Sequence, residues 1–121
     1  MLRKLPDLEL EVMQALWACG GSAQRAEIEQ QLAQHPMAPT TLLTLLTRLS
    51  EKGFLSIEKA GRRSMYTPLV SRQDYLAAQS NRFFHKLCGG NLSTLASALC
   101  DSGLTREELA QLSALLERGE L

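Results

Sequence analysis

The stretch from Ala38 to Gly53 constrains this chain more than any other part of the sequence. Read as an α-helix, with about 100° between successive residues, it places four leucines on one face: Leu42, Leu45, Leu46 and Leu49. The opposite face carries Thr40, Thr44 and Thr47, flanked by Arg48. Threonine is a mediocre helix former, so this face is a poor choice for stability alone. Short hydroxyl side chains with methyl groups can enter a DNA major groove closely, which favours a recognition helix. The alternative is a buried helix whose threonine face meets another element.

The totals of the chain set limits on its class. Its 121 residues suffice for one domain, or for a small domain with an appended assembly element. The 13 basic and 13 acidic residues cancel, so net charge gives no evidence of a nucleic-acid or membrane partner. Cys19, Cys88 and Cys100 lack the Cys-x-x-Cys spacing, which argues against a disulfide framework and a standard zinc site. No apolar run approaches the roughly 20 residues of a membrane span. We therefore expect a cytoplasmic protein without membrane insertion and without a cofactor.

Three helices are expected in the first part of the chain. The first begins near Pro6, carries a wide apolar stripe and ends at Cys19-Gly20-Gly21. The second follows Ser22 and ends by Gln34 or His35, before Pro36; the third begins at Pro39. Short helices with tight turns predict a helix-turn-helix-like unit whose last helix is free to project into a groove.

A β-hairpin is expected next. Two β-like runs, residues 54–59 and 62–69, flank the turn Ala60-Gly61. Residues 48–63 hold five basic side chains against two acidic ones, so the positive charge that the total conceals is concentrated here. Lys59, Arg62 and Arg63 at the hairpin tip suit contacts to DNA phosphates, which position a protein without reading sequence. An ordinary solvated turn is the alternative.

The second half of the chain reads as further short helices. A Ser71-x-x-Asp74 capping pattern opens one that runs to about Leu87, before Gly89-Gly90. Another short helix follows, ending near Ser102-Gly103, and a Thr105-x-x-Glu108 box opens the last.

Their apolar stripes make a thin core in a single copy, so we expect pairing with a second chain rather than folding back on the first domain. The expected interface comprises Leu76, Phe83, Phe84, Leu87, Leu92, Leu95, Leu99, Leu109, Leu112 and Leu116. The expected fold is thus mainly α with a small β-hairpin: a winged helix-turn-helix domain over residues 1–70 and a helical dimerisation region over residues 71–121.

Several segments together resemble the BlaI/MecI/CopY family of penicillinase, methicillin-resistance and copper-operon repressors. They are residues 5–17, residues 38–49, Lys52-Gly-Phe-Leu55, Gly61-Arg62, Tyr66-Thr-Pro-Leu-Val70 and Gly89-Gly90. The resemblance implies a homodimeric winged-helix repressor of double-stranded operator DNA, with its third helix in the major groove, its wing on the backbone and its last helices as the dimer interface.

Site residues carry over where positions match. Thr41 and Thr44 align with groove-facing threonines of the family, and Arg48 with an arginine near the backbone. Members commonly have Lys or Arg where this chain has Thr40, and often Arg where it has Leu43, so guanine readout by a long basic side chain is reduced. The predicted recognition set is Thr40, Thr41, Leu43, Thr44, Thr47 and Arg48, and Leu43 suggests contact with a thymine methyl group.

The family's known regulation implies further partners. β-Lactam-responsive members are cut by a membrane metalloprotease sensor at an Asn-Phe bond, which makes such a protease a candidate partner, but residues 95–100 contain no Asn-Phe. Copper-responsive members use Cys-x-Cys motifs, and this chain has none. A metal set of His85, Cys88 and Cys100 remains an alternative.

Two other classes of protein compete with a DNA-binding repressor. A winged-helix protein-interaction module that never binds specific DNA is compatible with the neutral total charge. No enzyme is predicted, because no phosphate loop, nucleophile motif or metal tetrad is present in the sequence.

Overall fold

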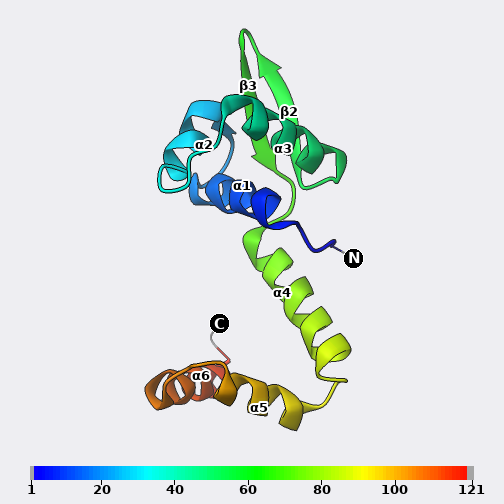
Figure 1. The fold of residues 1–121 in the computed structure, drawn as a ribbon, viewed down its shortest axis with the longest axis vertical. Helices are drawn as coiled ribbons and strands as arrows, with labels where there is room; N and C mark the ends of the chain where they lie inside the picture. Colours follow the sequence, from blue (N-terminus) through cyan, green and yellow to red (C-terminus); the bar gives the residue numbers. More distant parts are fainter. Residues whose placement is uncertain (1, 120–121) are drawn as a thin grey trace. The chain divides into compact units, whose positions relative to one another are not determined.

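The computed structural model describes residues 2–119 and forms two compact units, the first ending at Gln79 and the second beginning at Ser80. Figure 1 labels the elements of both units. In the first unit they are α1 (Asp7–Ala18), β1 (Ala23–Gln24), α2 (Arg25–Gln31), α3 (Pro39–Glu51), β2 (Leu55–Ala60) and β3 (Arg63–Pro68). Helix α4 (Arg72–Arg82) begins in the first unit and is followed by the π-helix η1 (Phe83–Leu87), α5 (Leu92–Asp101) and α6 (Arg106–Arg118).

The first unit is built around a single apolar core. Helices α1 and α3 begin and end close to where the sequence predicts, and the acidic residues Asp7 and Glu9 lie in the first turn of α1, where the helix dipole favours negative charge. The cluster of buried side chains comprises Leu5, Val12, Met13, Ala15, Leu16, Ala23, Ile28, Leu32, Leu42, Leu45, Leu46, Leu49, Phe54, Leu55, Tyr66 and Tyr75. These side chains come from all three helices, the sheet and α4, so one core holds the unit together.

The predicted hairpin is confirmed, and it belongs to a sheet of three antiparallel strands in the order β1-β3-β2. Strands β2 and β3 pair from Leu55 opposite Pro68 to Ala60 opposite Arg63, and Figure 1 shows their turn projecting away from the helices of the unit. Gly61, the first of the two loop residues, has a φ of 69°, as a type II′ hairpin turn requires at that position.

The expected start of the second helix is wrong. Residues 23 and 24 form β1, which pairs with Tyr66 and Met65 of β3, and α2 begins only at Arg25. The Ser22 hydroxyl lies 2.7 Å from that of Thr67, while the carboxylate of Glu27 accepts a hydrogen bond of 3.1 Å from the backbone N–H of Gln24 at the start of α2. Pairing with a distant strand therefore decides the structure of this segment.

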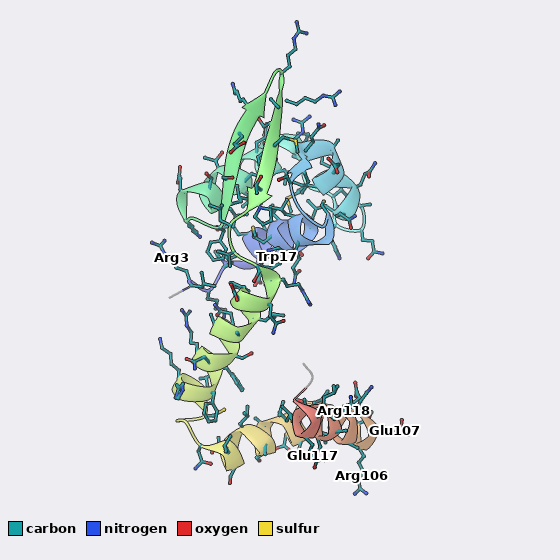
Figure 2. All side chains as sticks on the ribbon, turned by 180° about the vertical axis from the view of Figure 1, so that it is seen from behind. Arg3, Trp17, Arg106, Glu107, Glu117 and Arg118 are labelled. Carbon is teal, nitrogen blue, oxygen red and sulfur yellow. The ribbon has the colours of Figure 1, made fainter. Side chains whose placement is uncertain are left out.

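The first turns of α4 are anchored in the core of the first unit through Tyr75. Its hydroxyl accepts a buried hydrogen bond of 2.9 Å from the backbone N–H of Leu5, and its ring centroid lies 5.9 Å from those of both Trp17 and Phe54. The Trp17 indole donates to the carbonyl of Val70 at 2.9 Å, and Figure 2 shows Trp17 where α1 meets the start of α4. The domain boundary was expected after residue 70, whereas the first compact unit extends to Gln79 and so includes Tyr75.

The second unit consists of short helices with well-formed ends. Asn91 caps α5 through the N–H of Thr94, and Thr105 and Glu108 form the reciprocal capping box predicted for α6. At the start of α4, which lies in the first unit, the Ser71 hydroxyl accepts from the N–H of Asp74 at 3.0 Å. The predicted helix to Leu87 is confirmed, with its last turn in π geometry before Gly89. Among residues 2–119, no helix is long and apolar enough to cross a membrane.

Candidate nucleic-acid interface

Helix α3 divides into a buried and an exposed face, as its sequence predicts. The side chains of Leu42, Leu45, Leu46 and Leu49 are buried in the core. The exposed side chains are Thr40, Thr41, Leu43, Thr44, Thr47 and Arg48, the complete set predicted for recognition. Leu43, at 39% exposed, is the one leucine of α3 that lies outside this buried face. The exposed face offers short polar and apolar groups with a single long cation.

The threonine hydroxyls on this face donate to their own helix. Thr44 Oγ1 donates to the carbonyl of Thr40 and Thr47 Oγ1 to that of Leu43, each at 2.9 Å. A hydroxyl whose proton is used in this way still has oxygen lone pairs that accept hydrogen bonds. The face therefore presents acceptors and methyl groups at Thr44 and Thr47, while Arg48 supplies donors.

The hairpin of β2 and β3, which we call the wing, carries the predicted basic residues at its end. Lys59, Arg62 and Arg63 are all exposed, with Arg62 in the two-residue loop and Arg63 at the first position of β3. Arg63 Nη1 donates to Gln24 Oε1 at 3.2 Å, which links the first residue of β3 to the residue that precedes α2. Lys59 and Arg62 extend from the hairpin where long cations can reach a phosphate backbone.

A hollow is lined by residues of both α3 and the wing. Its lining includes Leu43 of α3, Arg62 and Arg63 of the wing, Arg25 at the first position of α2, and also Gln24 and Tyr66. Arg25 also forms a 2.9 Å ion pair with Glu29 one turn along α2. The sequence reading did not select Arg25, although the helix before a recognition helix commonly crosses the DNA backbone.

A second hollow lies on the other flank of α3. It is lined by Thr40, Thr41, Thr44, Leu45 and Arg48 of that helix and by Leu8 of α1. Leu8 is 52% exposed although it lies in the first turn of an amphipathic helix. The sequence reading also missed Leu8, whose only signal is its position outside the buried stripe of α1.

Lys52, one of the five basic residues in the 48–63 stretch, is paired within the protein and is not exposed for a phosphate contact. Its Nζ lies 2.7 Å from Oε1 of Glu9, and its side chain is 23% exposed. Four of the five basic residues of the stretch thus remain exposed around the helix and wing.

The residues predicted for chain pairing are poorly covered in the single chain. Exposed fractions are 42% for Leu76, 39% for Phe83, 76% for Leu87, 73% for Leu92 and 59% for Leu116. Five others are half-buried: Phe84, Leu95, Leu99, Leu109 and Leu112. Helices α5 and α6 contain no buried residue, which leaves their apolar stripes open.

The alternative metal set is not assembled in the single chain. In the part of the chain that the structure describes, no three His, Cys, Asp or Glu side chains are grouped to hold a metal ion; Cys88 is buried and Cys100 is exposed.

The Cys19 thiol donates to the carbonyl of Ala15 at 3.3 Å, and burial, with the charge of Glu27 adding to it, raises its pKa. Cys19 thus stays protonated as a small packing residue.

Comparison with known proteins places these features in context. A sequence profile described as penicillinase repressor matches residues 5–118. The chain is 32% identical to the penicillinase repressor of Bacillus licheniformis over 120 residues, 96% of this chain and 94% of that protein. It is 28% identical to the methicillin resistance regulatory protein MecI of Staphylococcus aureus strain N315, covering 95% of this chain and 94% of that protein.

Solved structures agree on the fold. The solution structure of monomeric Bacillus licheniformis BlaI in complex with the blaP half-operator is 36% identical and has a TM-score of 0.51, covering 62% of this chain and 92% of that chain. The DNA-binding domain of the repressor BlaI, with the same identity and coverage, has a TM-score of 0.53. The winged-helix class predicted for the first part of the chain is confirmed.

Proposed function

The chain belongs to the penicillinase repressor family, and on this premise we propose that it represses transcription by binding a palindromic operator as a homodimer. The observation that carries the proposal is the face of α3, where threonines, Leu43 and Arg48 are exposed above a fully buried leucine face. The similarity to BlaI, whose structure was solved with a half-operator, supports DNA as the ligand of that face.

We assign base recognition to α3 in the major groove. The Thr44 and Thr47 hydroxyls, which donate within the helix, accept best from adenine or cytosine amino groups, and their methyl groups can contact thymine. Leu43 adds a further apolar contact that fits a thymine methyl group. A reading face of this composition favours A·T pairs opposite Leu43 over the guanine that a long cation would select there.

The wing and Arg48 supply contacts to the phosphate backbone. Lys59, Arg62 and Arg63 are exposed at the hairpin end, and phosphate neutralisation by such residues makes affinity fall steeply with salt. These contacts carry no sequence information themselves. Replacing Arg62 is therefore expected to weaken binding to all duplexes alike.

We assign dimerisation to the helices that follow the wing. The open apolar stripes of α5 and α6 can be covered by the same stripes of a second copy, in a self-complementary interface. A dimer of this kind reads two half-sites about one helical turn apart or slightly more.

Footprinting on DNA upstream of its own gene, followed by titration of the protected sequence, tests the proposal. We expect a palindromic sequence to be protected, and we expect the dimer to retard that DNA in a gel-shift titration at low salt. The absence of any shift at low salt, or equal and weak binding to every duplex, would instead favour a protein-interaction module.

Leu43→Arg provides a sharper test of recognition. If Leu43 contacts a thymine methyl group, this variant shifts the preferred half-site toward guanine at one position, and a wrong base there changes the affinity by about 1–3 kcal/mol. Selection from a randomised half-site library measures the shift. Arg62→Gln serves as the control, because its loss of affinity is expected to leave the selected sequence unchanged. An unchanged preference in Leu43→Arg would remove Leu43 from the reading set.

A further inference from the structure

A buried carboxylate of α1 reaches the end of the recognition helix. Glu9 is 4% exposed, and its Oε1 lies 2.7 Å from Nζ of Lys52, the residue that follows the last turn of α3. The Lys52 backbone N–H also donates to the carbonyl of Arg48 at 3.0 Å, so the lysine is fixed to α3 by its main chain and to α1 by its side chain. A buried charge of this kind is stable only with a close partner of opposite sign.

This ion pair is a directional contact between α3 and α1, unlike the apolar packing of the α3 leucines. The buried leucines of α3 pack through non-directional apolar contacts, and such packing tolerates small rotations and shifts better than a short charged hydrogen bond does. At the opposite end of the helix, Ala38 provides no side-chain cap. The polar connection to α1 is thus concentrated at the C-terminal end, one turn beyond Arg48.

We propose that Glu9 and Lys52 are positioning residues that aim the reading face of α3, and that Lys52 is not a DNA contact although it lies in the most basic stretch of the sequence. The inference rests on the proposed function, because it concerns the helix assigned to operator recognition. The carboxylate of Glu9 balances the positive charge of Lys52 within the protein. Phosphate contacts are therefore left to exposed cations such as Lys59.

A matched pair of variants of the full-length dimer tests the charge part of the proposal. Lys59→Met removes an exposed cation of the wing and is expected to lower the slope of log affinity against log salt by about one for each phosphate that the lysine neutralised. Lys52→Met makes the same chemical change but is expected to leave that slope unchanged. An equal fall in slope for both variants would show that Lys52 binds phosphate and would overturn the inference while leaving the proposed function intact.

Glu9→Gln tests the positioning part and separates it from loss of folding. We expect about five- to tenfold weaker binding to the operator with unchanged affinity for a random duplex, as measured for the active, folded fraction, since directly coupled residues contribute energies of this order. A purely structural role would lower both affinities by the same factor. A DNA contact by Lys52 would predict the opposite sign, because removing Glu9 would free the lysine and leave operator affinity equal or increased.

Lys52→Arg provides the rescue arm. It retains a cation that can pair with Glu9 and is expected to recover most of the ratio of operator to random-duplex affinity that Lys52→Met loses. Thermal unfolding of each variant gives the folded fraction at the titration temperature. An unchanged affinity ratio in both Glu9→Gln and Lys52→Met would overturn the positioning role. Failure of the wild-type protein to prefer any operator would overturn the proposed function instead.

Discussion

The two units of this chain differ in where their apolar side chains lie. In the first unit sixteen apolar or aromatic residues form one buried cluster, to which α4 contributes Tyr75. In residues 80–119 of the second unit, Cys88 is the one buried residue, and the leucines of α5 and α6 are exposed or half-buried. Both units contain helices, and the first also contains the three-stranded sheet. Helix capping does not account for the difference, because α5 and α6 have side-chain caps while α1 and α3 have none.

The difference indicates which unit can be stable by itself. Full burial of a large aliphatic side chain contributes about 1.5–3 kcal/mol, and the first unit gains this many times over. The second unit gains little of it in a single copy, while its caps at Asn91 and Thr105 contribute only about 1 kcal/mol each. Its helices therefore need a covering surface, which the proposed second copy supplies.

The largest expected effect comes from placing a charge in the second unit. Leu112→Glu inserts a carboxylate into the half-buried stripe of α6 and should separate the proposed dimer, because an unpaired charge is not tolerated in an apolar interface. Loss of the second binding site is expected to weaken full-operator binding by roughly 100-fold or more while half-site binding is retained. Sedimentation gives the mass, and titration gives both affinities.

Ser113→Glu is the matched control for this change, because it adds the same charge at the adjacent exposed position. A dimeric Leu112→Glu protein with normal operator affinity would show that α6 is not part of the pairing surface.

An intermediate effect is expected from one substitution made in each unit. Leu46→Ala removes a fully buried side chain of α3 and should lower the free energy of unfolding of the first unit by about 2–5 kcal/mol, whatever the protein concentration. Leu92→Ala changes a side chain that is 73% exposed, so its effect should stay within about 0.5 kcal/mol for the single chain and grow as the concentration rises and the dimer forms. Urea unfolding over a range of protein concentrations measures both. A large, concentration-independent effect at Leu92 would contradict the contrast between the units.

The smallest expected effect concerns the helix that links the units. Tyr75→Phe keeps the ring contacts with Trp17 and Phe54 but leaves the buried N–H of Leu5 without its partner. A buried donor without an acceptor costs about 1–3 kcal/mol, and the loss should fall on the first unit. Hydrogen exchange at the Leu5 amide and urea unfolding measure it. Gln73→Ala, an exposed change on the same helix, is the control, and equal stability of the two variants would mean that the Tyr75 hydroxyl adds nothing.

Local patterns were sufficient to predict some elements and not others. The leucine period of α3, the turn glycine Gly61 and the capping box at Thr105 are encoded within a few residues, so their elements were predicted from sequence. Strand β1 is only two residues long and exists because Ala23 and Gln24 pair with β3 far along the chain. A pairing between residues so far apart in the sequence cannot be predicted from a local pattern.

The candidate site shows the same division. The exposed face of α3 and the wing cations follow from periodicity and from the hairpin turn, so their placement was predictable. Lys52 looks like one more surface cation in the sequence, and only its proximity to Glu9, 43 residues earlier, reveals the ion pair. Arg25 and Leu8 join the site because the fold brings them beside α3.

The anchoring of Tyr75 has a consequence for how this protein could be recombined with others. Exchanging the helices proposed to pair for another dimerisation module at the end of the wing, after Val70, would take Tyr75 away and expose the surface it covers. A junction after Gln79 would keep both that contact and the bond from Gln79 to the carbonyl of Leu2. A junction that keeps the first unit intact would thus lie inside α4 rather than in a loop.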